Sequence, residues 1–272
     1  MGVSATGPGW LFCPADRPER FEKAAAVADV VILDLEDGVA AKDRVAARQA
    51  LMDTPLDPAR TVVRVNPTST SDHELDLKAV AATDYTTVML AKSEHPEQVA
   101  ALAPLDVVVL VETPLAALNV VALVGPDNAF AVMWGAEDLF AVTGGTANRH
   151  ADGRYRDVAQ HVRSQTLLAA KAYGRMALDS VYLDINDTDG LRAEADDAVA
   201  VGFDAKVAIH PTQVPVIRAA YEPTAQQIEW ARHVLAESRV RRGVFQFGGI
   251  MVDAPVLRRA ERIVQLAPHP GA

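Results

Sequence analysis

Cysteine is nearly absent from this chain of 272 residues, in which Cys13 is the only thiol. A single cysteine excludes an intramolecular disulfide framework and a zinc site built on several thiolates. Basic residues are outnumbered, 26 against 36 acidic ones, which gives a net charge of −10. Such a chain is not expected to bind nucleic acid or an anionic membrane surface. An anionic ligand would need a local basic pocket.

Long hydrophobic runs and processing signals are also missing. No stretch approaches the roughly 18–20 apolar residues that a membrane span needs. The N-terminus lacks the basic and apolar regions of a secretory signal. We therefore expect a cytoplasmic protein. Half of the residues are hydrophobic, which is enough for a sizeable core.

What the sequence contains is an alternation of short apolar runs and alanine-rich amphipathic stretches. The apolar runs predict strands at 9–14, 30–35, 61–66, 87–91, 107–111, 129–134, 180–185 and 205–209. The intervening stretches predict helices, for example at 18–28, 39–52, 96–102, 115–123, 155–173 and 191–201. Eight such units indicate an α/β fold, the (β/α)8 TIM barrel. A doubly wound open sheet is the alternative, but no G-x-G-x-x-G turn follows the first run.

The end of the chain departs from this alternation. It predicts a helix at 226–237, a charged break at 239–243, an extended apolar run at 244–253 and a last helix at 254–266. We expect a barrel domain over 1–222 and a C-terminal extension over 223–272 that is not an independent domain.

Carboxylates follow the fifth and sixth predicted strands. Glu112 ends one run, and Asp138 follows the other after a short turn. Because the carboxyl ends of barrel strands share one rim, the two acids can meet there. Mg²⁺ prefers oxygen ligands and usually takes one or two carboxylates. The pattern indicates a metal site, with two solvated acids that begin helices as the alternative.

Further polar residues end the other strands. Arg64 lies within a β-branched run, where it needs partners. It predicts either a structural ion pair with Glu36 or Asp37, or a fork for a substrate oxygen. His210 predicts either an acid/base group or a rim histidine bonded to backbone. The remaining strand-end residues are Asp34, Asn66, Lys92, Asp184 and Asn186.

Three features lie outside the strand ends. Arg17, Arg20 and Lys23 follow the first strand and could contact a phosphate-bearing ligand or form a solvated helix face. The polar loop at 144–157 suits a lid or a subunit contact. Asp253 predicts an N-cap of the last helix, although the glycines before it also permit a mobile arm that carries this carboxylate.

Seven motifs occur in a fixed order along the chain. They are Cys13-Pro-Ala-Asp-Arg-Pro-Glu-Arg20, Asp34-Leu-Glu-Asp-Gly-Val39, Arg64-Val-Asn66, Val111-Glu-Thr113, Gly135-Ala-Glu-Asp138, Ile209-His-Pro-Thr-Gln213 and Gly249-Ile-Met-Val-Asp253. Together they resemble the citrate lyase β-subunit-like (CitE-like) branch of the HpcH/HpaI aldolase family. Within that branch they resemble the stand-alone actinobacterial CitE-like proteins and the malyl-CoA and citramalyl-CoA lyases.

The resemblance implies a TIM barrel, usually a homotrimer, that binds Mg²⁺ and a CoA thioester. Glu112 and Asp138 match the metal ligands, with Mn²⁺ as a possible substitute. Arg64 matches the arginine on the substrate oxygen, and Asp253 matches an acid/base supplied by a neighbouring subunit. The matches for binding the 2-oxo acid are Gly135, Ala136, Glu137 and Asp138, and those for CoA are Arg17, Arg20 and Lys23. Supporting positions are Glu36, Asp37, Lys92 and His210.

The implied activity is Mg²⁺-dependent cleavage of a 3-hydroxyacyl-CoA, such as malyl-CoA, citramalyl-CoA or hydroxymethylglutaryl-CoA, into an acyl-CoA and a 2-oxo acid. Condensation followed by thioester hydrolysis is one alternative. A citrate lyase β-type subunit that acts with an acyl-carrier partner is another. A thioester makes the enolate accessible, so we do not expect Lys92 to act as a Schiff-base nucleophile.

Overall fold

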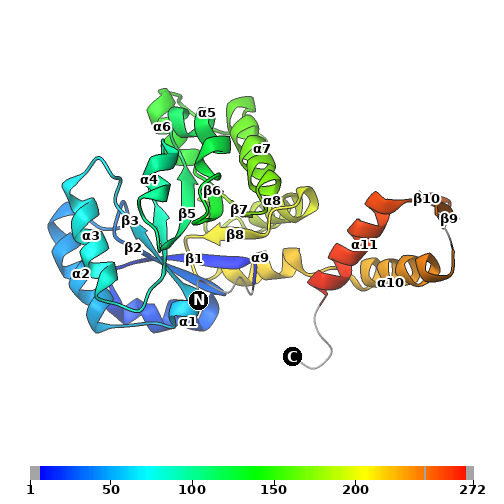
Figure 1. Ribbon diagram of the computed structural model, residues 1–272, viewed down its shortest axis with the longest axis horizontal. Coiled ribbons are helices and arrows are strands. Elements are labelled where there is room, and N and C mark those ends of the chain that lie inside the picture. The colour runs from blue at the N-terminus through cyan, green and yellow to red at the C-terminus, as the bar shows by residue number, and fades with distance from the viewer. Residues whose placement is uncertain (1–6, 242, 268–272) are drawn as a thin grey trace. The chain divides into compact units, whose positions relative to one another are not determined.

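The computed structural model describes residues 7–241 and 243–267 and divides into two compact units, Met1–Ile217 and Arg218–Ala272. In the first unit, eight parallel strands close into a barrel in sequence order (Figure 1). The strands are β1 (Gly9–Pro14), β2 (Val30–Asp34), β3 (Thr61–Val65), β4 (Thr87–Leu90), β5 (Asp106–Val111), β6 (Ala129–Trp134), β7 (Met176–Asp179) and β8 (Ala205–Ala208). The predicted barrel is confirmed, and β1 pairs with both β2 and β8, which excludes the open sheet.

Helices follow the strands and surround them. They are α1 (Phe21–Val27), α2 (Arg44–Asp53), α3 (Ser71–Ala81), α4 (Pro96–Ala100), α5 (Pro114–Leu123), α6 (Ala136–Thr143), α7 (Asp157–Ala172) and α8 (Thr188–Val201). Short 3-10 turns are η1 (Pro18–Arg20), η2 (Ala41–Asp43) and η3 (Pro58–Arg60). A ninth helix, α9 (Gln213–Tyr221), begins in the first unit and ends in the second.

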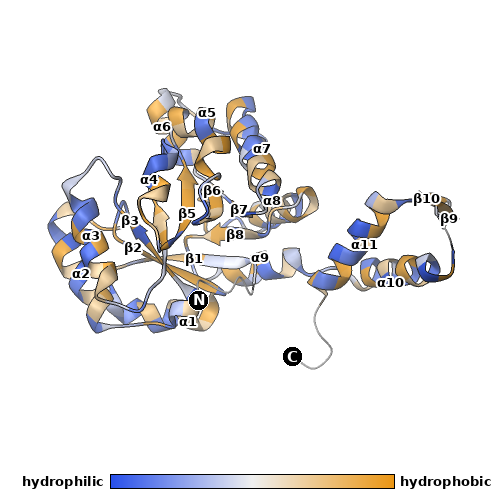
Figure 2. Ribbon diagram, in the orientation of Figure 1, coloured by the Kyte–Doolittle hydropathy of each residue, from blue (hydrophilic) through white to orange (hydrophobic). Residues whose placement is uncertain are grey.

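The barrel interior is a packed apolar core to which all eight strands contribute. Its buried members are Trp10, Val30, Ile32, Val62, Met89, Val108, Leu110, Ala131, Met133, Leu178, Ala205 and Val207. Figure 2 shows β5 in orange, whereas the surrounding helices alternate between orange and blue. Apolar side chains that fill the interior in layers leave no pore through a barrel of this kind.

The alternation of side-chain direction along each strand identifies which residues at the carboxyl rim face the barrel interior. Successive side chains of a strand point to opposite faces. Beyond the core residues of β2, β3 and β5, the next inward positions are Asp34, Arg64 and Glu112. All three are buried. The candidate site is therefore the top layer of the barrel interior.

One predicted strand is wrong. The expected strand at 180–185 is replaced by β7, which pairs Met176 with Ala131 of β6 and Leu178 with Ala205 of β8. The β-branched and aromatic composition of 180–185 favoured a strand, but the segment has left the sheet and Leu183 is exposed. Asp184, predicted as a rim residue, instead accepts hydrogen bonds from the backbone of Asn186 and Asp187.

The second unit contains α10 (Ala225–Val240), a hairpin of β9 (Phe245–Phe247) and β10 (Ile250–Val252), and α11 (Ala254–Leu266). A small apolar cluster holds these elements together, with Ala231, Val234, Val252 and Ala260 at its centre. The predicted final helix at 254–266 coincides with α11. The domain boundary at 222/223 stays a prediction.

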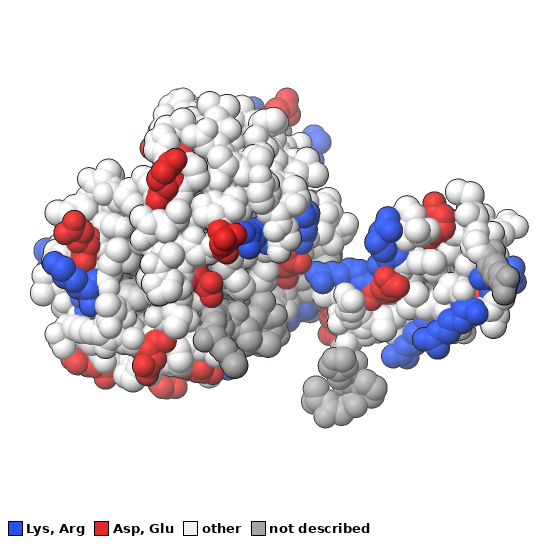
Figure 3. Space-filling model, in the orientation of Figure 1, with Lys and Arg blue, Asp and Glu red and all other residues white. Residues whose placement is uncertain are grey.

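Charge is distributed unevenly between the two units. Residues 218–272 hold eight arginines and five acidic residues, so this unit is basic although the chain carries a net charge of −10. The blue side chains on the C-terminal unit are visible in Figure 3. The excess of acid therefore lies in the barrel unit.

Among the described residues, no helix combines the length and the apolar character needed to cross a membrane.

Candidate active site

Arg64 is held at the barrel rim by two acids and a ring. Its Nε and Nη2 donate to Asp34 at 2.7 and 2.6 Å, and its Nη1 lies 3.0 Å from Glu36. The guanidinium carbon lies 4.7 Å from the centre of the Phe12 ring. The predicted ion pair with Glu36 is present, but Asp34 is the closer partner, and Asp37 pairs with Lys92 instead. The arginine is thus charged and fixed before any ligand arrives.

Lys92 links the acids of β2 to the metal candidates. Its Nζ pairs with Glu36 and lies 3.2 Å from Asp37. The same nitrogen lies 4.0 Å from Glu112 and 3.4 Å from Asp138. Four carboxylates therefore surround one ammonium group. Burial would lower the pKa of Lys92, but Glu112 and the other acids raise it overall, so the lysine stays charged.

The backbone of Lys92 also orients Glu112. Lys92 has a φ of 50°, in the left-handed region that side-chain-bearing residues seldom adopt. Its amide donates to Oε1 of Glu112 at 2.9 Å. Glu112 is 2% exposed, so a solvated loop acid does not describe it. Burial raises its pKa to about 8, assisted by the charge of Asp138 and opposed by Arg64 and Lys92.

Glycine at position 135 permits the close approach of β5 and β6. A Cβ at this position would lie 2.9 Å from the Cβ of Glu112 and 3.1 Å from its Oε2. Beyond Gly135, α6 starts at Ala136 and places Asp138 in its first turn, where the side chain is partly exposed. Glu137, the other acid of this turn, accepts from Asn148 at 2.6 Å and so turns toward the 144–157 loop.

The donor set suits a hard divalent cation. Glu112 and Asp138 converge on the position of one cation, the Lys92 ammonium. Among the described residues, no cluster of three or more acids, histidines or cysteines is arranged to hold a metal. Two carboxylates with the remaining positions open to water and substrate match the habit of Mg²⁺. Glu112 and Asp138 are therefore the residues that would hold it.

The candidate CoA-contacting residues lie around η1 and in the first turn of α1. Arg17 lies 3.9 Å from Asp16, and Arg20 lies 3.9 Å from Glu19. Both arginine side chains are about half exposed, at 50% and 52%. Lys23 is also exposed. Their exposure suits both the ligand-binding prediction and the solvated-face alternative.

His210 and Asp253 both have local partners. Nδ1 of His210 lies 2.8 Å from the Thr212 hydroxyl, and its backbone amide donates to Gln213 at 3.2 Å. This geometry favours the rim histidine. Asp253 is the N-cap of α11, as predicted, and accepts from the Val256 amide at 3.3 Å. It belongs to the C-terminal unit, and its catalytic role stays a prediction.

Sequence reasoning missed a second buried charge cluster on the other side of the barrel wall. Lys206 of β8 is fully buried and contacts Asp179 at 3.2 Å and Glu194 at 2.7 Å. Arg163 of α7 pairs with Asp179 at 2.9 Å. The signal was present, because Lys206 interrupts an apolar run in the same way as Arg64.

Comparison with known proteins identifies the family of this chain. The family model described as HpcH/HpaI aldolase/citrate lyase matches residues 9–211. A citrate lyase subunit beta-like protein of Mycobacterium tuberculosis is 60% identical over 267 residues, which cover 98% of each chain. The mitochondrial citramalyl-CoA lyase of Mus musculus is 32% identical over 291 residues, which cover 94% of this chain and 85% of that protein.

A solved structure is similar over the same extent. The crystal structure of CitE from M. tuberculosis in complex with magnesium, acetoacetate and coenzyme A has a TM-score of 0.94 and 60% identity, and the match covers 97% of this chain and 99% of that chain. The resemblance seen in the seven motifs is confirmed, and the protein belongs to the HpcH/HpaI aldolase/citrate lyase family.

Proposed function

We propose that this protein is a Mg²⁺-dependent carbon–carbon lyase that cleaves a 3-hydroxyacyl-CoA of the malyl-CoA or citramalyl-CoA type into an acyl-CoA and a 2-oxo acid. The observation that carries the proposal is the convergence of Glu112 and Asp138 on one cation position, beside the fixed guanidinium of Arg64. The magnesium and coenzyme A bound to the similar CitE, and the activity named for the citramalyl-CoA lyase, support the substrate class.

The reaction breaks the bond between C2 and C3 of the acyl chain. A base removes the proton of the 3-hydroxyl group, the oxygen becomes the carbonyl of the 2-oxo acid, and the bonding pair moves onto the thioester as an enolate. Return of a proton to the enolate carbon gives the acyl-CoA. Mg²⁺, when bound, would supply Lewis-acid stabilisation of negative charge on the substrate oxygens.

Arg64 faces the charge that develops on the thioester oxygen. A guanidinium has five N–H donors. All three nitrogens are already held by Asp34 and Glu36, so the group needs no reorganisation when it donates its remaining N–H groups to an oxyanion. Donors fixed in advance and aimed at developing charge are the largest single source of catalysis in many enzymes.

Asp253 is our candidate for the proton transfer. We propose that it comes from a neighbouring copy within a homotrimer, as the family resemblance implies. In the described structure it follows the β9–β10 hairpin, whose Ile250 and Met251 are exposed. Burial of these apolar residues against a neighbouring copy would be favourable. Docking of the hairpin would therefore bring the Asp253 carboxylate to the neighbour's site.

Turnover on a panel of 3-hydroxyacyl-CoAs, with products identified by mass spectrometry, tests the activity. We expect an acyl-CoA and a 2-oxo acid in equal amounts and complete loss of turnover in EDTA, restored by Mg²⁺ or Mn²⁺. Release of free CoA in place of acyl-CoA would identify thioester hydrolysis instead. No turnover on any thioester, together with co-purification of an acyl-carrier protein, would identify a subunit of a complex.

Mixing two inactive variants tests the shared site. Arg64→Ala and Asp253→Asn are each expected to be inactive. If barrel and acid come from different copies, mixed trimers contain sites with both groups intact, about one quarter of all sites in an equal mixture. Activity near that level after co-refolding supports the trimer, and no recovery would place both groups in one copy.

A further inference from the structure

The second charge cluster lies on the outer side of β6, β7 and β8, next to the strand end that leads to Asp138. Trp134, Asp179 and Lys206 occupy the positions of β6, β7 and β8 that alternate with inward-facing core residues. They therefore point outward, into the layer between strands and helices. All three are fully buried.

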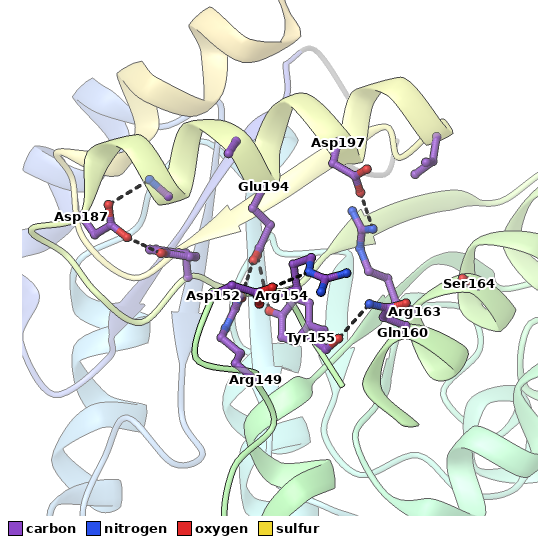
Figure 4. A pocket seen from close by; sticks show the side chains of 15 residues that line it. Arg149, Asp152, Arg154, Tyr155, Gln160, Arg163, Ser164, Asp187, Glu194 and Asp197 are labelled. Carbon is purple, nitrogen blue, oxygen red and sulfur yellow. Dashed lines mark hydrogen bonds and ion pairs between the residues drawn. The ribbon is translucent and has the colours of Figure 1, made fainter. Parts of the chain in front are cut away.

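The cluster is fully paired, so its geometry is fixed. Lys206 donates to the Ser180 carbonyl at 2.7 Å in addition to its two carboxylate partners. Glu194 also forms an ion pair with Arg149 at 2.7 Å, and Arg163 forms one with Asp197 at 2.6 Å. Both pairs are drawn in Figure 4. A buried ammonium group is tolerated only with such compensation.

This cluster is hydrogen-bonded to the end of β6. The indole Nε1 of Trp134 donates to Oδ1 of Asp179 at 2.8 Å. Two residues later, the amide of Ala136 donates to the Ser180 hydroxyl at 3.4 Å. Asp179 and Ser180, at the end of β7, thus each accept a hydrogen bond from one neighbour of Gly135.

The segment 134–136, held by these hydrogen bonds, leads directly into α6 and so positions Asp138. A Cβ on Gly135 would lie only 2.9 Å from the Glu112 Cβ, so this backbone runs close to Glu112, and α6 begins immediately after it. A helix start that shifts by a fraction of an ångström carries the Asp138 carboxylate with it. The distance between the two acids therefore depends on the bonds made by Asp179 and Ser180.

We propose that Asp179 and Ser180 are positioning residues of the metal site, which hold the exit of β6 so that Asp138 faces Glu112. The inference rests on the proposed function, because it takes these two acids as the Mg²⁺ ligands. Partners that orient metal ligands typically contribute about 10- to 100-fold to metal affinity or activity.

Isothermal titration of Mg²⁺ into the purified full-length chain tests the proposal without relying on turnover. Asp179→Asn should weaken Mg²⁺ binding at least about tenfold. Ser180→Ala should weaken it about fivefold, as expected for one lost hydrogen bond. Asp179→Asn removes a partner of both Lys206 and Arg163 and could fail to fold. Ser180→Ala is therefore the decisive variant.

Asp204→Asn is the matched control. Asp204 accepts from the Ala177 amide at 2.9 Å and from Lys171 at 2.5 Å, at the opposite end of β7. This variant should lower the melting temperature while leaving Mg²⁺ affinity within about twofold of wild type. Equal Mg²⁺ affinity in Ser180→Ala and wild type would overturn the positioning role and leave the proposed function intact. A wild-type chain that binds no Mg²⁺ would overturn both.

Discussion

Asp34 and Arg64 occupy paired positions on β2 and β3, and the carboxylate of one accepts two hydrogen bonds from the guanidinium of the other. The same carboxylate also accepts from the amides of Glu36 and Gly38 at 2.9 and 2.8 Å. Asp34 is therefore fixed by its own turn before it fixes the arginine. This arrangement explains why a charged side chain can end an otherwise apolar strand.

Arg64→Ala should impair both catalysis and folding. Loss of one preorganised donor lowers kcat by about 100- to 1000-fold. Removal of one partner from a buried ion pair destabilises a protein by about 3–5 kcal/mol, because Asp34 and Glu36 remain buried without their cation. Steady-state kinetics on the folded fraction and urea unfolding measure the two effects.

Arg60→Ala is the control for this prediction. Arg60 precedes the same strand at its opposite end and donates to the Asp29 carbonyl at 3.0 Å. Its removal should reduce stability but leave kcat near the wild-type value. An Arg64→Ala enzyme with wild-type turnover would eliminate Arg64 as the group that stabilises the enolate.

Gly135→Ala should disrupt the metal site by steric contact alone. The φ of Gly135 is −112°, which any residue adopts, so backbone strain plays no part. The added methyl group would stand 2.9 Å from the Glu112 Cβ, a separation that forces one of the two strands to shift. We expect Mg²⁺ affinity, measured by calorimetry, to fall at least about tenfold. The unfolding midpoint should also fall, because overpacking costs about 1–3 kcal/mol. Unchanged Mg²⁺ binding would mean that Glu112 is not a ligand.

The sequence predicted most of the barrel because its signal is local. Buried runs without alternation identify parallel strands, and polar residues at their ends identify the rim. Arg64 was found because a charge inside an apolar run needs a partner. The same reasoning applied to Lys206 would have revealed the outer cluster.

Tertiary contacts decided what the sequence could not predict. The segment 180–185 has the stronger strand composition, yet β7 lies earlier because Met176–Asp179 is the segment that pairs with both β6 and β8. The partners of Arg64 were likewise undetermined, because the sequence predicted Glu36 or Asp37. The register of β2 against β3 places Asp34 opposite Arg64, and Glu36 is the second partner.

Acid should remove the stabilisation contributed by Asp179. Burial alone would raise its pKa, but Lys206 and Arg163 outweigh burial and hold the pKa at about 2, below the 3.8 that is usual for an aspartate. Because the folded pKa is the lower one, the stabilisation is present above pH 3.8 and disappears as the pH falls toward 2. The difference is worth roughly 2 kcal/mol.

The measurement is urea unfolding of wild type and Asp179→Asn between pH 6 and about pH 2. The gap in unfolding free energy between the two proteins should narrow steadily below pH 4. Asp197→Asn removes the exposed partner of Arg163 and should show a much smaller gap, since surface pairs contribute about 0–1 kcal/mol. A gap for Asp179→Asn that does not change with pH would contradict the assignment.

The lone thiol should be unreactive in the folded protein. Cys13 is 3% exposed, and burial raises its pKa to about 11. The thiolate is the reactive species, so both the low thiolate fraction at pH 8 and the lack of access slow modification. We expect a thiol reagent such as DTNB to leave the native protein unmodified over hours and to titrate one equivalent in guanidinium chloride. The Mg²⁺-free and Mg²⁺-loaded proteins should behave alike, because Cys13 alternates with Trp10 and Phe12, which face the barrel interior, and so faces away from the site. Rapid modification of the native chain would show that β1 opens locally, and its rate would then report the free energy of that opening.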